Sequence, residues 1–144
     1  MSARARAVAA ARGAVGARYR LHGRDPRFGL DCVGLVGLAL RAGGCTDPIP
    51  AGYALRGGTA GGMLDLIDRA ALRRTDRPQP GDLLLFAVGP AQFHLAIKSA
   101  DGIYHADALL RRVVERPGVP PWPLLAAWAL IDDGPVRGIV LGEG

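Results

Sequence analysis

The sequence predicts an α+β domain in which helices of the first half pack on one face of an antiparallel β-sheet formed by the second half. Apolar residues before residue 73 recur at spacings of three and four, as on a helix face. After residue 82 they gather in short runs bounded by turn residues. Helices followed by strands is the α+β order. A chain of 144 residues suits one domain, expected to cover 1–144.

Three helices are predicted in the first half of the chain. They cover Ala3 to about Val15, Cys32 to about Ala42, and about Gly62 to Leu72. A loop is predicted over Tyr19–Leu30, because its glycines and the Asp25-Pro26 pair break any period. Prolines make segment 46–50 extended or turning.

Four strands are predicted in the second half, at Leu83–Phe86, Phe93–Ser99, Ile103–Ala106 and Leu125–Ile131. The second and third should form a hairpin, because Ser99 to Gly102 are turn residues. If Ala100 and Asp101 alone form the loop, His105 lies opposite Ala96 on the face of His94. A three-residue loop would place the two histidines on opposite faces.

Charge and composition argue against several classes of protein. The net charge of +5 comes from arginines spread along the chain, without the concentrated stripe of a nucleic-acid-binding protein. The two cysteines, Cys32 and Cys45, are too few for a disulfide framework, and no spacing indicates a metal site. No export signal and no apolar run long enough to span a membrane is evident, so we expect a protein that is soluble and cytoplasmic as synthesised.

Cys32 is the candidate nucleophile, because it begins a helix directly after Asp31, a capping residue. The helix dipole should lower its pKa from about 8.5 towards roughly 3.5–7.5. A catalytic cysteine needs a base and a group that orients the base, and His94 and His105 are available in the predicted hairpin. The alternatives are that Cys32 is a small buried apolar residue and that Asp31 is only a helix cap.

Four ordered motifs resemble the NlpC-type cell-wall cysteine peptidases, a papain-like group. They are Asp31-Cys32-x-Gly34-Leu35-Val36, Pro80-Gly81-Asp82-Leu83, His94-Leu95-Ala96-Ile97 and Gly102-x-Tyr104-His105-Ala106. The resemblance implies a papain-like fold with Cys32 as nucleophile, His94 as base and His105 as the residue that orients it. It places Tyr19 and Asp31 beside the substrate and requires no metal or organic cofactor. Val33 and Ala96 depart from the residues common at their positions.

The resemblance also implies a substrate, the stem peptides of peptidoglycan, cleaved between D-glutamate and diaminopimelate through an acyl-enzyme. The run Tyr19–Pro26, together with Asp31–Gly34, resembles the subgroup associated with phage tails and gene transfer agents. A phage-like tail particle could then carry the enzyme to the cell wall, with tail proteins as partners. The competing interpretation is a catalytically silent structural component of such a tail.

Overall fold

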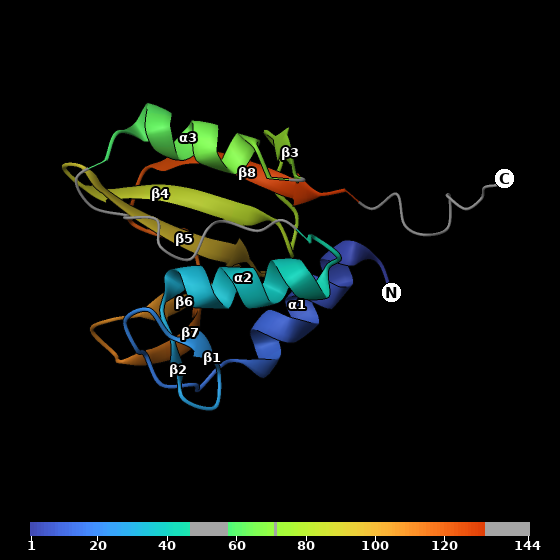
Figure 1. Cartoon of the computed structure of the whole chain (residues 1–144), viewed down its shortest axis with the longest axis vertical. Helices are drawn as coiled ribbons and strands as arrows, with labels where there is room; N and C mark the ends of the chain where they lie inside the picture. Colours follow the sequence, from blue (N-terminus) through green and yellow to red (C-terminus); the bar gives the residue numbers. More distant parts are fainter. Residues whose placement is uncertain (47–57, 71, 132–144) are drawn as a thin grey trace, which may run out of the picture.

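The structure, a computed structural model, describes residues 1–46, 58–70 and 72–131, and within them it has three helices and eight strands (Figure 1). The helices are α1 (Ala3–Gly13), α2 (Cys32–Ala42) and α3 (Ala60–Asp68). The strands are β1 (Arg24–Asp25), β2 (Gly29–Leu30), β3 (Leu72–Thr75), β4 (Leu83–Gly89), β5 (Gln92–Lys98), β6 (Gly102–Asp107), β7 (Arg112–Pro117) and β8 (Leu124–Leu130).

Six of the strands form one antiparallel sheet in the order β3-β8-β4-β5-β6-β7. Strands β4 to β7 follow one another as a meander, and β8 returns to pair with the other edge of β4. The predicted α+β class is therefore confirmed.

The two edge strands, β3 and β7, were not predicted. Both contain two adjacent charged residues, Arg73-Arg74 in β3 and Glu115-Arg116 in β7, and the charged side chains of both strands are exposed or half-buried. An edge strand can leave one face in water, so it need not form the apolar run from which a strand is predicted.

The helix predictions are confirmed with shifted ends. The bounds of α2 are those predicted, whereas α1 ends at Gly13 and α3 begins at Ala60, after its capping residue Thr59. Helix α3 ends at Asp68, short of the predicted Leu72, because Leu72 begins β3. Of the predicted extended segment, residues 47–50 lie outside the described residues.

The segment between α1 and α2, predicted as a loop, contains the small hairpin of β1 and β2. It is also tied to the far edge of the main sheet, because Gly16 N–H donates to the Val113 carbonyl and Tyr19 N–H donates to the Arg111 carbonyl. This segment therefore delivers the chain to the start of α2 along a fixed path.

Helices α1 and α2 pack together against the sheet and enclose the main core (Figure 1). This core contains Cys32 and, from β5, the side chains of Phe93, Leu95 and Ile97. A second, smaller core uses Ala96 from β5 with side chains of β4, β6 and β8. The N-terminus of α2 thus lies beside β5.

Candidate active site

Asp31 caps α2, as predicted, and both oxygens of its carboxylate accept hydrogen bonds from nearby residues. Oδ1 accepts hydrogen bonds from Gly34 N–H and the Arg24 guanidinium, each at 2.8 Å. Oδ2 accepts from His22 N–H at 2.7 Å. Because Asp31 is only 6% exposed, this carboxylate holds the loop and the helix start together.

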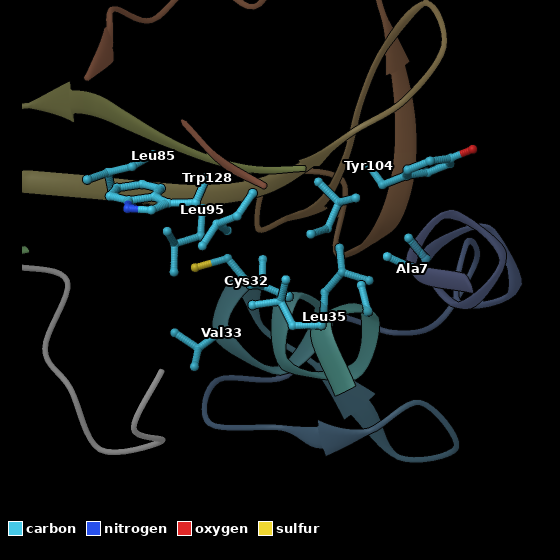
Figure 2. Close-up of a cluster of buried hydrophobic side chains, with 14 of the residues drawn as sticks. Ala7, Cys32, Val33, Leu35, Leu85, Leu95, Tyr104 and Trp128 are labelled. Carbon is cyan, nitrogen blue, oxygen red and sulfur yellow. The ribbon is translucent and has the colours of Figure 1, made fainter. Parts of the chain in front are cut away.

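The sulfur of Cys32 projects from α2 towards the sheet, where Leu95 lies (Figure 2). Backbone N–H groups of Leu95, Val33 and Cys32 itself lie near the sulfur and act to lower its pKa. Burial nevertheless raises the pKa of the thiol to about 11. The predicted lowering is therefore wrong for this state, because loss of water around the sulfur outweighs the N–H groups at the helix start.

His94 and His105 lie side by side, which is the outcome expected of a two-residue loop and not of a three-residue one. The pairs Ile97–Tyr104 and Lys98–Ile103 show that the loop is the two residues Ala100 and Asp101. Continuing this register by one residue sets His105 opposite Ala96. His94 Nε2 is 3.0 Å from His105 Nδ1, and the rings meet edge to face. One hydrogen bond therefore joins the two imidazoles.

The sulfur lies at the point where β5 and β6 stop pairing. Lys98 N–H points towards β4, where it donates to the Asp82 carbonyl. Because N–H direction alternates along a strand, Leu95 N–H points towards β6. The ladder between these two described strands ends at Ile97–Tyr104, so this N–H faces the sulfur.

The structure thus sets the sulfur against Leu95, the residue that follows His94. Among the hydrogen bonds of the described residues, however, none joins the sulfur to either imidazole. The histidines form a bonded pair, and Cys32 is their neighbour across the backbone of β5.

Both histidines are held in the uncharged form. Burial, reinforced by the charge that His105 would carry, lowers the pKa of His94 to about 4. Burial also lowers the pKa of His105, with Asp107 opposing this shift and Arg116 adding to it. At neutral pH the site therefore holds a neutral thiol and two neutral imidazoles, which can accept and pass on protons.

Sequence reasoning missed three side chains around the imidazoles. Asp107 Oδ2 lies 3.9 Å from His105 Nε2. The ring of Trp122 lies 5.3 Å from that of His94 and 5.8 Å from that of His105. The Arg116 guanidinium lies over the Trp122 ring, 5.6 Å from its centre. Asp107 could have been found, because it lies two residues after His105 on the same face of β6, whereas Trp122 follows a proline-rich loop without a periodic signal.

Tyr19 lies in the segment before α2, where it bridges to Leu30 and packs against the main core. Within residues 1–46, 58–70 and 72–131, no group of three His, Cys, Asp or Glu side chains is arranged to hold a metal ion. In the same part of the chain, no helix is long and apolar enough to cross a membrane.

No protein-family model and no curated protein matches this sequence. Solved structures do match. The NlpC/p60 domain of the peptidoglycan hydrolase SagA has a TM-score of 0.57 at 22% identity, over 79% of this chain and 88% of that chain. The fold is that of NlpC/p60 domains.

Two further structures show the same NlpC/p60 fold. NlpC1 from Trichomonas vaginalis has a TM-score of 0.67 at 20% identity over 89% of this chain, which spans 45% of that protein. The P60 domain of an antigen from M. avium subspecies paratuberculosis has a TM-score of 0.59 at 20% identity, over 92% of this chain and 96% of that chain.

Proposed function

We propose that the chain is a cysteine peptidase that hydrolyses amide bonds in peptidoglycan stem peptides. The observation that carries this proposal is the hydrogen-bonded pair His94–His105, together with a thiol at the start of α2 that lies against Leu95, the residue after His94. The NlpC/p60 fold supports the same conclusion, and SagA, one of its structural neighbours, is a peptidoglycan hydrolase. From the resemblance of the four motifs, we propose that the bond cleaved is the one between D-glutamate and diaminopimelate.

In the proposed reaction, His94 Nδ1 takes the thiol proton while the sulfur attacks the substrate carbonyl. The C–N bond then breaks, and the imidazolium gives its proton to the leaving amine. Water, deprotonated by His94, hydrolyses the resulting thioester, which releases the acid and restores the thiol. Because the resting groups are neutral, proton transfer occurs together with attack and needs no preformed ion pair.

The backbone at the start of α2 supplies the groups that stabilise the oxyanion. The first intrahelical bond runs from Leu35 N–H to the Asp31 carbonyl, and Gly34 N–H is taken by the Asp31 side chain. The N–H groups of Cys32 and Val33 precede these bonds and lie beside the sulfur. They are placed to donate to a carbonyl oxygen under attack.

Two residues beside this site are proposed to contact or position the substrate. Tyr19 would line the cleft, since its segment leads to the helix start. Asp31 would act by shaping the loop, because its oxygens already accept from Gly34, Arg24 and His22.

The decisive test is digestion of purified peptidoglycan, with mass analysis of the fragments. Wild type should release fragments cut after D-glutamate, and Cys32→Ala should release none while keeping its thermal melting. Cys45→Ala is the matched control, because it removes the other buried cysteine and should retain turnover. Undiminished cleavage by Cys32→Ala would refute the proposal.

A second candidate function is that of a silent structural component of a phage-like tail, and one observation favours it. Cys32 is 8% exposed with a raised pKa, as an inert buried cysteine would be. The same digestion decides between the two, because a silent component leaves peptidoglycan intact at every enzyme concentration. Association with tail proteins is proposed for either function and would be seen as co-purification with tail particles.

A further inference from the structure

His105 carries a buried nitrogen that takes part in no hydrogen bond within the described part of the chain. The residue is 2% exposed, and its Nδ1 is taken by His94. Among the described residues, its Nε2 has no hydrogen-bond partner. The carboxylate oxygen Oδ2 of Asp107 faces this nitrogen at 3.9 Å, which is too long for a hydrogen bond but close for a charge acting on a dipole in a buried site.

The other oxygen of Asp107 is fixed by a turn. Oδ1 accepts from Leu109 N–H at 2.9 Å and from Leu110 N–H at 3.0 Å. The turn therefore holds the carboxylate in one orientation, with Oδ2 directed at His105.

In the series Asp107–His105–His94, the position of the proton on His105 determines the position of the proton on His94. A negative oxygen beside Nε2 of His105 favours the tautomer with the proton on that nitrogen. His105 Nδ1 is then an acceptor, so the bond between the rings must come from His94 Nε2–H. His94 Nδ1 is left as a lone pair, the only form of this neutral imidazole that can take a thiol proton.

We propose that Asp107 is a positioning residue that fixes both histidines as Nε2–H tautomers and so keeps His94 Nδ1 ready to act as a base. This role rests on the proposed peptidase function for its effect on rate, whereas the tautomers themselves are independent of activity. Asp107 acts through His105 and His94 and touches neither the thiol nor the substrate.

The charges around His105 agree with this assignment. Asp107 favours a proton on the ring, while the Arg116 guanidinium disfavours a second positive charge there. A charge on His105 would in turn oppose a charge on His94, and burial keeps both rings neutral. At neutral pH, Asp107 therefore affects which nitrogen of His105 carries the proton and not whether the ring is charged.

D107N should reverse the direction of the hydrogen bond between His105 and His94, with little change in the shape of the side chain at position 107. The turn needs an acceptor for two N–H groups, so the amide oxygen takes the place of Oδ1 and the NH2 group faces His105. That donor favours a lone pair on Nε2, which moves the His105 proton to Nδ1. His94 Nε2 must then accept, and its proton moves to Nδ1, where it blocks uptake of the thiol proton.

The tautomers are measured directly by long-range ¹H–¹⁵N correlation spectra of ¹⁵N-labelled protein at pH 7. Wild type should show His94 and His105 protonated at Nε2, and D107N should show both protonated at Nδ1. Asp101→Asn, in the exposed turn of the same hairpin, is the charge-matched control and should keep the wild-type spectrum. Wild-type His105 protonated at Nδ1, or an unchanged D107N spectrum, overturns the proposal.

Kinetics on muropeptide give the second readout. D107N should lower kcat by about 100-fold with KM little changed, because the variant impairs proton transfer and leaves substrate contacts intact. D101N should match wild type. Retention of full activity by D107N would overturn the role of Asp107. If wild type is inactive but its tautomers are those assigned, the peptidase proposal fails while the assignment stands.

Discussion

At the scale of single residues, burial has opposite effects on the two kinds of ionisable group in the site. It raises the pKa of the Cys32 thiol to about 11 and lowers the pKa of His94 to about 4, because in both cases the uncharged form is favoured. The Cys32 thiol and the His94 imidazole are therefore both uncharged between these two pH values. The reactivity of the site depends on where neutral hydrogen-bond donors and acceptors point.

The lowered pKa of His94 makes the fold sensitive to acid. An unfolded histidine has a pKa of about 6.5, so between that value and about 4 the unfolded chain binds more protons than the folded one. The free energy of unfolding should thus fall as pH drops through this window, by on the order of 2 kcal/mol from His94. Urea unfolding of wild type and His94→Gln at pH 7 and pH 4.5 measures this. An equal loss of stability in both proteins would contradict the assignment.

At the scale of elements, the start of α2 is positioned by the loop that precedes it. Gly34 packs so closely against the loop that an added Cβ would overlap the Gly23 carbonyl oxygen. Asp31 holds the same contact from the other side, through Gly34 N–H and His22 N–H. Loop and helix therefore set the place of the sulfur together.

Two glycines of α2 give a matched test of this contact. Gly34→Ala should destabilise the protein by about 1–3 kcal/mol, because rigid backbone stands where the methyl group would go. Gly37→Ala should be neutral or stabilising by up to about 1 kcal/mol, since its methyl group meets only the movable end of Arg41, at 3.1 Å. Denaturant melts compare the two. Equal stability of the variants would show that the loop does not constrain the helix.

At the scale of the whole molecule, a buried carboxylate joins α1 to the sheet. Asp82 is fully buried at the start of β4, and its oxygens accept from Arg4 Nε at 2.9 Å and from Gln79 N–H at 2.8 Å. Gly81 brings the turn against the backbone of α1. The first helix is thus fastened to the strand that pairs with β5, which carries His94.

Removing this ion pair should loosen α1 from the sheet. Arg4→Ala leaves a buried carboxylate short of donors and should lower the free energy of unfolding by about 1–3 kcal/mol. Arg12→Ala removes an exposed arginine from the same helix and should change it little. Thermal melts at pH 7 measure both. A loss as large in Arg12→Ala would mean that general helix charge, and not the Asp82 contact, is responsible.

The sequence by itself determined the α+β class, the bounds of α2, the capping by Asp31 and the hairpin that carries His94 and His105. These follow from local rules, namely apolar periodicity, cap chemistry and turn residues. The sequence left open whether the loop of this hairpin has two or three residues, which the strand register of the structure decides. The same rules missed β3 and β7, whose charged faces are explained only by their place at the sheet edges.

The tertiary structure alone decided the electrostatic state of the site and its outer residues. A helix start predicts a lowered thiol pKa, but the packing of α2 on the sheet removes water from the sulfur and raises it. Likewise, Trp122, from the loop after β7, packs against the imidazoles, and Arg116 of β7 lies over the Trp122 ring. Desolvation and long-range contacts depend on which elements pack together, and the spacing of residues along the chain does not carry that information.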